Sequence, residues 1–388
     1  MSETPDNAAA REPNPTLAPD DPYAREEQTF PRLTEAQLDR IGRFGREEHL
    51  EKGATLFKRG DRSVDFFVIR EGSVEIFDRD KQGNPNVFTI HGDRQFTGEL
   101  DLFNDREILV SGRTGSDTTL IRVPRTDFRK LIQSEPDIGE IIMRAFILRR
   151  VGLIGHTQGG VVLLGSANGG DTLRIQRFLT RNGYPHRLLD PNRPDDKDDA
   201  EDFFGCLDIS REDLPVVVYD EKPLKNPTNI ELAGAIGLLE ELDIDRDWDL
   251  TVVGAGPSGL AAAVYAASEG LDVIVLETMA PGGQAGTSSK IENYLGFPTG
   301  ISGQALAGRA QVQAQKFGAR LAIARSAVAI KDEADGRYAI STDAEECVHS
   351  RAVVIASGAR YRKLNLENLE KFEGKGIHYA ATAMEAEL

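Results

Sequence analysis

The sequence is poor in cysteine. Only Cys206 and Cys347 occur among its 388 residues, they fall in different predicted domains, and no CxxC pair is present. Disulfide exchange needs a thiolate beside a second sulfur, so no local dithiol can perform it. Two cysteines fit a reducing compartment, and we therefore predict a cytoplasmic location. Each is expected to be buried as a small hydrophobic residue.

The sequence also has little positive charge and no long apolar run. Lys and Arg number 46 against 63 Asp and Glu, which gives a formal net charge of −17. Nucleic-acid binding relies on clustered Lys and Arg, so we expect no nucleic-acid partner. Without a membrane-length apolar segment or a signal peptide, we expect no membrane span. Six scattered histidines predict no metal site, and the acidic segment 190–202 is expected to be a solvated loop.

Residues 1–30 contain five prolines and few large apolar side chains, so we expect a disordered tail. Order should begin at Leu33. Thr34 and Gln37 make a capping-box pattern, and the first helix is expected to end near Gly42.

Between residues 31 and 151 the pattern changes to short alternating segments separated by glycine. Such spacing predicts a small antiparallel barrel or jelly roll. The expected strands lie within residues 54–61, 65–77, 86–93, 96–103 and 118–124. An amphipathic helix should follow, because apolar residues from Ile138 to Leu148 recur at helical spacing.

Three segments of this region resemble the cyclic nucleotide-binding domain family: RGD at 59–61, FFVIREGSVEIF at 66–77 and TGELDLF at 97–103. The resemblance implies that a glycine-rich turn starts a short helix whose amides hold the cyclic phosphate, and that the glutamate holds the ribose. The matching ligand residues are Gly98, Glu99 and Leu100.

One position departs from that family. Where the family carries an arginine that pairs with the phosphate, this chain has Ile108. The strongest charge-assisted contact to a phosphate is therefore missing. Arg106 or Arg113 could substitute for it. The alternative is a retained fold with a different ligand, or with none.

Residues 160–238 predict a third fold. A glycine-rich linker at 152–160 leads into a strand, a helix, a second strand and a strand opened by Pro215. This order is similar to the thioredoxin and glutaredoxin fold. In that family a dithiol lies between the first strand and the first helix, where this chain has residues 166–171 and no cysteine. The resemblance places Pro215 at the family's cis-proline, and a strand-edge proline explains it nearly as well.

From Asp249 the sequence joins an apolar strand, a triple-glycine turn, an alanine-rich helix, a second strand and an acidic end. Gly254 permits the tight turn, Gly256 lets the backbone approach a pyrophosphate, and Gly259 lets the helix pack on the strand. The helix starting near Pro257 presents its amides to the anion. Glu277, 23 residues after Gly254, suits a ribose hydroxyl.

With PGGQAGTSSKIENYLGFPTGISG at 281–303 and VVIASGA at 353–359, residues 248–388 resemble the thioredoxin reductase family of flavoproteins. The resemblance implies a Rossmann-like domain that binds FAD, and it suggests a homodimer. The expected cofactor-binding residues are Gly254, Ala255, Gly256, Pro257, Ser258, Gly259, Glu277, Thr278, Gly282, Gly283, Gln284, Asn293, Ala356, Ser357 and Gly358.

Two departures from this family bear on activity. The positions of its redox cysteines are occupied by Ala380 and Ala383, and alanine carries no thiolate. The family's NAD(P)H domain and the returning part of its FAD domain have no counterpart here, so we expect only the first segment of the FAD domain. No side chain is a convincing acid, base or nucleophile, and none is assigned as catalytic.

Taken together, the sequence predicts a multidomain protein, α/β plus a β-barrel. The three units match a bacterial family of thioredoxin reductases that carry a cyclic nucleotide-binding domain. The leading hypothesis is an FAD-dependent oxidoreductase regulated by its N-terminal domain, with an electron acceptor other than a local disulfide. The alternative is a ligand-sensing or scaffold protein built from redox folds. An incomplete product in which only the first two units fold is a third possibility.

Overall fold

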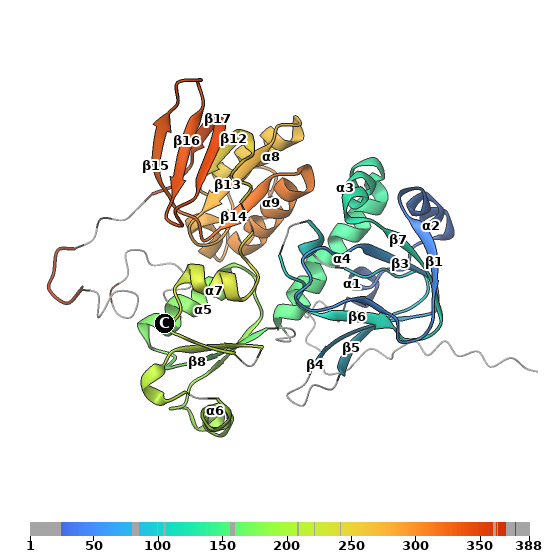
Figure 1. Cartoon of the computed structure of the whole chain (residues 1–388), viewed down its shortest axis with the longest axis horizontal. Coiled ribbons are helices and arrows are strands. Elements are labelled where there is room, and N and C mark those ends of the chain that lie inside the picture. Colours follow the sequence, from blue (N-terminus) through green and yellow to red (C-terminus); the bar gives the residue numbers. More distant parts are fainter. Residues whose placement is uncertain are drawn as a thin grey trace, which may run out of the picture.

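The structure, a computed structural model, describes residues 25–79, 85–98, 100–103, 106–155, 160–207, 209–220, 222–240, 242–359, 362, 364–369 and 377. Its elements form three groups in chain order, each built on its own sheets (Figure 1). We refer to residues 25–155 as the N-terminal unit, 160–240 as the middle unit and 242–359 as the C-terminal unit. None of the described helices is both long and apolar enough to cross a membrane.

The N-terminal unit contains two antiparallel sheets, one ordered β1-β7-β3 and the other β2-β6-β4-β5. Their strands are β1 (Arg46–Leu50), β2 (Thr55–Phe57), β3 (Phe66–Glu71), β4 (Val74–Arg79), β5 (Pro85–His91), β6 (Ser111–Thr114) and β7 (Thr118–Val123). Alternate residues of β3 face opposite ways. Phe66 and Val68 pack toward the helices, whereas Phe67 and Ile69 pack toward β4 and β6.

Helices cover the outer face of the first sheet. They are α1 (Glu26–Thr29), α2 (Glu35–Ile41), α3 (Arg125–Ser134) and α4 (Pro136–Gly155), with the short 3-10 helices η2 (Gly42–Phe44) and η3 (Leu100–Phe103). The Thr34–Gln37 capping box is present, as predicted. The rings of Phe66 and Phe103 each contact those of Phe128 and Phe146, which also contact each other, in this core.

Three local predictions for this unit are wrong. Residues 26–29, expected to be disordered, form α1, because Thr29 is fully buried and its carbonyl accepts a hydrogen bond from Arg149 Nε at 2.9 Å. Segment 96–103 contains η3 in place of a strand. Residues 152–155, expected to belong to a linker, form the end of α4 instead.

The middle unit has one four-stranded sheet, ordered β11-β10-β8-β9, in which only β8 and β9 are parallel. The strands are β8 (Val161–Leu164), β9 (His186–Leu189), β10 (Val216–Tyr219) and β11 (Lys222–Lys225), and the helices are α5 (Gly170–Arg181), α6 (Pro194–Cys206), η4 (Arg211–Asp213) and α7 (Asn229–Ala235). The peptide bond between Leu214 and Pro215 is cis.

The acidic segment 190–202 was predicted to be a loop, and most of it belongs to α6 instead. Pro194 occupies the first helical turn, where a missing N–H costs nothing. Asp195 and Asp196 follow it and complement the positive end of the helix. Ala200 is fully buried and anchors the helix on the sheet.

The C-terminal unit is a six-stranded sheet ordered β14-β13-β12-β17-β16-β15. The first four strands are parallel, whereas β15, β16 and β17 pair antiparallel. The strands are β12 (Asp247–Val253), β13 (Val273–Glu277), β14 (Arg320–Ile323), β15 (Ala327–Asp332), β16 (Tyr338–Thr342) and β17 (Cys347–Ile355). Helices α8 (Pro257–Ser268) and α9 (Gly303–Phe317) pack together beside them, and η5 (Gly283–Thr287) lies between them in sequence.

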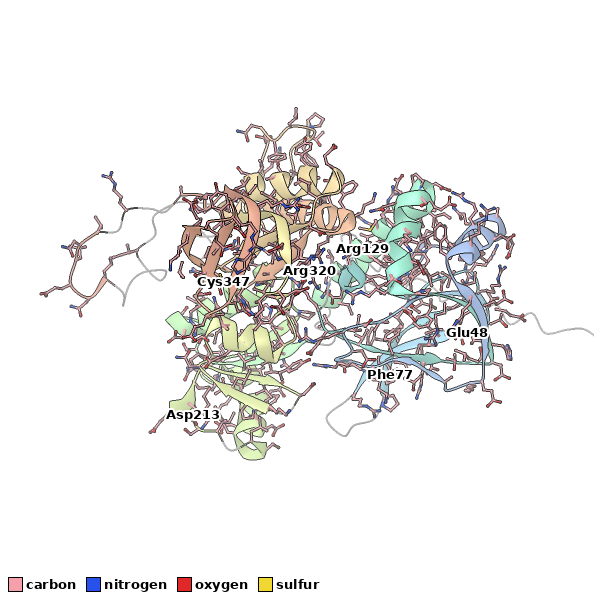
Figure 2. The ribbon with its side chains drawn as sticks, turned by 45° about the horizontal axis from the view of Figure 1, so that its top comes forward. Glu48, Phe77, Arg129, Asp213, Arg320 and Cys347 are labelled. Carbon is pink, nitrogen blue, oxygen red and sulfur yellow. The ribbon has the colours of Figure 1, made fainter. Side chains whose placement is uncertain are left out.

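Direct hydrogen bonds join the three units. Glu107 N donates to Gly237 O at 3.2 Å and Arg62 Nη1 donates to Leu239 O at 3.0 Å, which tie the N-terminal unit to the middle unit. The C-terminal unit rests against both others, and Figure 2 shows Arg129 of α3 on the side of the N-terminal unit that faces Arg320 of β14. The C-terminal unit is therefore in contact with both the N-terminal unit and the middle unit.

Candidate functional site

The triple-glycine turn of the C-terminal unit has the geometry that its sequence predicts. Gly254 has φ +101°, and a Cβ there would lie 2.5 Å from the carbonyl oxygen of Ala356. A Cβ on Gly259 would lie 1.9 Å from the carbonyl oxygen of Gly254. By contrast, a Cβ on Gly256 would meet nothing nearer than Gly283 Cα at 4.0 Å. Two glycines are therefore required by packing, and Gly256 leaves the turn open on its outer side.

Helix α8 begins at Pro257, directly after Gly256, as predicted. Its first amides point along the helix axis toward the turn, and the positive end of a twelve-residue helix attracts an anion. Ser258 and Gly259 lie in this first turn, and no acidic residue is present there. The arrangement can hold a phosphate group through backbone donors alone.

Glu277 ends β13 and is 9% exposed. One carboxylate oxygen accepts from Ala255 N at 2.7 Å, and the other accepts from Met279 N at 2.9 Å and Ala280 N at 3.2 Å. A carboxylate offers about four lone-pair positions, so one position remains for a hydroxyl donor. Glu277 thus fixes the glycine turn and can still contact a ribose. The adjacent Thr278 is exposed.

A second pair of glycines lies against the turn. Gly282 N donates to Ala255 O at 2.7 Å, and both Gly282 and Gly283 have positive φ. A Cβ on Gly283 would lie 3.0 Å from Gly256 Cα. Segments that are far apart in sequence therefore meet at one edge of the sheet.

The last segment of the predicted site joins the same edge. Ala356 N continues the pairing of β17 by donating to Val253 O at 2.8 Å, and the Gln284 side chain donates to the carbonyl oxygen of Ala359. Ser357 and Gly358 lie between these contacts and are exposed. Asn293 is exposed on the segment between η5 and α9, and among the described residues it makes no hydrogen bond to the turn.

A residue that the sequence did not indicate reaches this loop from the middle unit. Arg181, at the end of α5, donates to Gly283 O at 2.8 Å and to the Met279 sulfur at 3.0 Å. Its neighbour Asn182 donates to Met279 O at 3.0 Å. Burial lowers the pKa of Arg181, and the charge of Glu277 opposes that shift. No local pattern could reveal this contact, because it arises only when the two units pack together.

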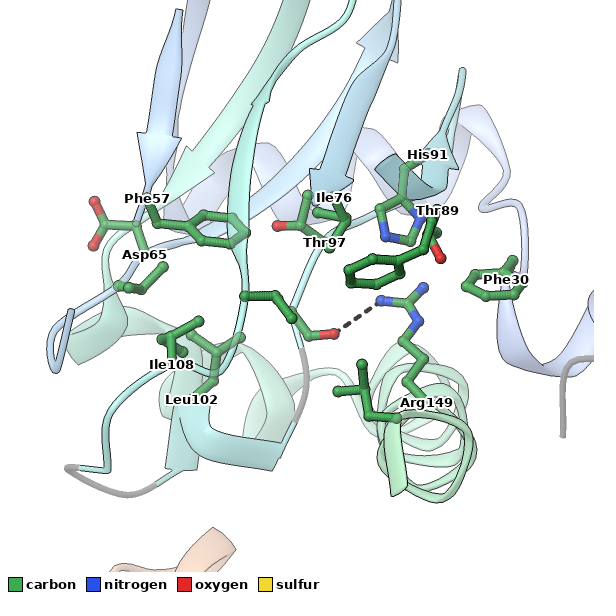
Figure 3. A pocket seen from close by; sticks show the side chains of 15 residues that line it. Phe30, Phe57, Asp65, Ile76, Thr89, His91, Thr97, Leu102, Ile108 and Arg149 are labelled. Carbon is green, nitrogen blue, oxygen red and sulfur yellow. Dashed lines mark hydrogen bonds between the residues drawn. The ribbon is translucent and has the colours of Figure 1, made fainter. Parts of the chain in front are cut away.

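The N-terminal unit contains a second candidate site, a cavity between its two sheets and α4 (Figure 3). About 580 Å³ of space lies between the lining atoms, part of it open to solvent. Gly98 and Ile108 both line it. Of the other two predicted ligand residues, Glu99 lies outside the described residues, and Leu100 starts η3 without a described side chain.

The cation in this cavity is Arg149 of α4. Its guanidinium donates to the carbonyl oxygens of Thr29, Phe96 and Gly98 at 2.9 to 3.0 Å, and it lies over the Phe96 ring at 4.7 Å. The two arginines considered from the sequence, Arg106 and Arg113, are not among its lining residues. Arg113 instead pairs with Glu75 at 2.8 Å.

The cysteines differ from the sequence expectation. Cys206 was predicted to be buried and is exposed at the end of α6, and Cys347 is only partly buried at the start of β17 (Figure 2). The alanines at 380 and 383 lie outside the described residues. Within the described part of the chain, no group of three or more His, Cys, Asp or Glu side chains could hold a metal ion.

Comparison with known proteins gives two family matches. Residues 47–135 match the cyclic nucleotide-binding domain, and residues 248–388 match the pyridine nucleotide-disulphide oxidoreductase family. Thioredoxin reductase of Listeria monocytogenes is 35% identical over 138 residues, covering 35% of this chain and 42% of the relative. For thioredoxin reductase of Treponema pallidum the identity is 37% over 139 residues, with 36% and 44% covered.

A solved thioredoxin reductase of T. acidophilum is 34% identical, with 34% of this chain and 42% of that chain covered and a TM-score of 0.31. The chain spans less than half the length of the curated relatives it matches. Its sequence thus joins a cyclic nucleotide-binding domain to a segment of the thioredoxin reductase type, and the resemblance is to FAD-dependent oxidoreductases.

Proposed function

We propose that this protein is an FAD-dependent oxidoreductase related to thioredoxin-disulfide reductase. The observation that carries the proposal is the open outer side of Gly256 between two glycines that packing requires. Only the glycine whose role is close approach to a phosphate has free space beside it. The relatives at 35% and 37% identity over this unit support FAD as the dinucleotide.

Different residues of the chain would bind different parts of this cofactor. The α8 amides and Gly256 would hold the pyrophosphate, and Glu277 would accept from a ribose hydroxyl. Gly282, Gly283 and Gln284, together with Ala356 and Ser357, would border the remainder of the cofactor. When bound, the flavin would supply hydride and electron transfer, with NAD(P)H as donor. The absence of CxxC implies that the electron acceptor is not a local disulfide.

The domain organisation belongs to the same proposal. A jelly roll at 31–151, a thioredoxin-like domain at 160–238 and a flavin domain at 248–388 are supported by the three separate groups of sheets. The parallel β8–β9 pair joined through α5, followed by the antiparallel hairpin of β10 and β11, is the element order of a thioredoxin-like domain. Regulation by the N-terminal domain, a homodimer and a cytoplasmic location complete the proposal.

A substitution at Gly256 tests this proposal. Aspartate is a favourable N-cap residue, so Gly256→Asp should preserve the fold while its charge repels a pyrophosphate. The matched control is Gly308→Asp on α9, where an added Cβ meets nothing within 4 Å. Titration of the full chain with FAD, followed by flavin fluorescence, should give binding to the wild type and to the control. Binding to Gly256→Asp should be at least about tenfold weaker.

Two results would contradict the proposal: no flavin binding by the wild-type chain, or equal binding by Gly256→Asp. Addition of NADPH to the flavin-bound chain then tests whether electrons pass from NADPH to the flavin. Bleaching of the visible flavin band would mean that the donor reaches the ring.

A second function is favoured by the lack of a dithiol in both redox-type units. Between β8 and α5 the chain has no cysteine, and Cys206 and Cys347 lie in different units. A ligand-sensing or scaffold protein would keep such folds without their chemistry. It predicts that the chain shows no flavin reduction, whereas the oxidoreductase predicts a reducible flavin.

A further inference from the structure

The cavity of the N-terminal unit has an apolar wall at the position where a cyclic phosphate would be expected. Ile108 stands where the related family has its arginine, and it is 6% exposed. The wall continues through Phe57, Ile76 and Leu102, which lie around the same space (Figure 3). Arg149 lines the same cavity, but the wall at Ile108 itself offers an anion neither a cation nor a hydrogen-bond donor, so placing an anion directly against this wall is costly. The wall therefore suits an uncharged, apolar group.

Arg149 is engaged with the protein itself through two of its three guanidinium nitrogens. Its Nε and Nη1 atoms are held by three backbone carbonyl oxygens, and its guanidinium lies against the rings of Phe30 and Phe96 at 5.5 and 4.7 Å. These contacts join α1, α4 and the segment after β5. Arg149 thus serves to hold the cavity together.

Two buried polar side chains face the cavity beside Arg149. Thr97 is 1% exposed and His91 is 3% exposed, and both line the space (Figure 3). Within the described part of the chain, neither Thr97 Oγ1 nor His91 Nδ1 has a hydrogen-bond partner. Buried polar atoms without partners are rare in folded proteins, and each one costs free energy. A ligand with a matching polar group would recover that cost.

The chemistry of these two atoms specifies the polar group. Burial lowers the pKa of His91 well below its ordinary value, and the charge of Arg149 lowers it further, so the imidazole is neutral. A neutral imidazole nitrogen and a threonine hydroxyl can each donate or accept, according to tautomer and rotamer. One hydroxyl group on a ligand donates and accepts at once, so it can satisfy both atoms.

We infer that the N-terminal cavity binds a small, uncharged, mostly apolar molecule bearing one hydroxyl group, in place of a cyclic nucleotide. The apolar body would contact Ile108 and its neighbours, and the hydroxyl would meet Thr97 and His91. Apolar cavities in proteins can bind molecules the size of benzene. The inference does not depend on the flavin, since it concerns only the N-terminal unit.

The experiment uses the full chain and 4-fluorobenzyl alcohol as the probe, observed by fluorine NMR line broadening. The alcohol should bind, and 4-fluorotoluene, which lacks only the hydroxyl, should bind at least about fivefold more weakly. Cyclic AMP at the same concentration should not displace the probe. This ligand pair needs no variant, so the result does not depend on the folding of an altered protein.

A variant of nearly the same shape then tests whether the hydroxyl of the probe contacts Thr97. Thr97→Val should reduce the affinity for the alcohol to that for 4-fluorotoluene. The matched control is Thr119→Val on β7, whose hydroxyl contacts His49 Nδ1 at 3.1 Å and which does not line the cavity. Thermal unfolding followed by circular dichroism checks that both variants are folded. The inference is overturned if the alcohol does not bind, if both fluorinated compounds bind equally, or if cyclic AMP displaces the probe.

Discussion

The two candidate sites are built from different parts of the chain. At the C-terminal turn the required features are backbone features: positive φ at Gly254 and a helix that starts at Pro257. In the N-terminal cavity the features are side chains brought together from distant segments, such as Phe30, Ile108 and Arg149. A site made of backbone groups can be predicted from a short stretch of sequence, because neighbouring residues determine the backbone conformation. A side-chain site exists only after the chain has folded.

The two sites also differ in exposure. His91 and Thr97 are almost fully buried inside the N-terminal unit. At the C-terminal site, Val354 is 37% and Ile355 is 68% exposed, on the part of β17 that pairs with β12 and extends beyond its pairing with β16. Strands in parallel sheets are commonly covered on both faces. This exposed end of β17 leads directly to Ala356 and Ser357, so the turn is accessible from solvent, whereas the two polar side chains of the cavity are not.

The largest loss of stability should come from adding a side chain at Gly259, where the helix and the glycine turn approach most closely. A Cβ on Gly259 would lie 1.9 Å from Gly254 O, a backbone atom that cannot rotate away. Gly259→Val should therefore destabilise the C-terminal unit by about 3 kcal/mol, the upper end for overpacked cores. Guanidinium unfolding followed by the fluorescence of Trp248, the single tryptophan and a buried residue of β12, measures this change.

The matched control is Gly308→Ala, because α9 has free space at that position. It should be neutral or stabilising by up to about 1 kcal/mol. Equal stability of Gly259→Val and the wild type would show that the helix and strand do not pack as closely as described. The C-terminal site would then not depend on close backbone packing, and it would not differ in this way from the N-terminal cavity.

Local sequence patterns predicted the structure correctly where residues close in the sequence determine the backbone conformation. The capping box at Thr34 and Gln37 and the start of α8 at Pro257 both follow from neighbours in sequence. Strands β1 and β6 were missed, because REEHL and SGRT lack alternating apolar residues and gain their place by pairing with β7 and β4. Helix α6 was missed because six of its thirteen residues are acidic, which resembles a solvated loop in the sequence.

The tertiary part of each site could not be predicted. Arg149, on α4, lies 53 residues after Phe96 in the sequence, and Arg181 reaches the Gly283 loop from another unit. Neither position belongs to a recognisable motif. Ile108, singled out in the sequence as the departure from the family, does line the cavity. Whether the cavity takes a phosphate stays a prediction.

A smaller effect should appear as pH dependence of the N-terminal unit. The pKa of His91 is well below 6.5 in the folded protein, because burial and Arg149 disfavour its charged form. Between the folded pKa and 6.5 the unfolded chain therefore binds more protons. Stability from this group is complete above pH 6.5 and falls as the pH decreases, by at most about 1.4 kcal/mol per pH unit. Urea unfolding at pH 7.5, 6.5 and 5.5 measures the slope.

The variant His91→Phe should flatten this dependence. His186→Phe is the matched control in the middle unit, since burial also lowers the pKa of His186, and it should leave the His91 contribution in place. If His91→Phe keeps the wild-type slope, His91 is not the group responsible. The cavity would then accept a protonated imidazole, and the assignment of an uncharged polar end would be wrong.

The smallest effect is expected for Arg113, one of the two arginines that could have replaced the missing phosphate partner. Arg113 pairs with Glu75 at 2.8 Å and lies over the Phe77 ring at 5.0 Å, with its side chain 34% exposed. Because partly exposed ion pairs contribute little, Arg113→Met should cost less than about 1 kcal/mol in urea unfolding. It should leave binding of 4-fluorobenzyl alcohol unchanged. If the wild type instead bound cyclic AMP and Arg113→Met did not, Arg113 would be the phosphate partner, and the two sites would both be nucleotide sites.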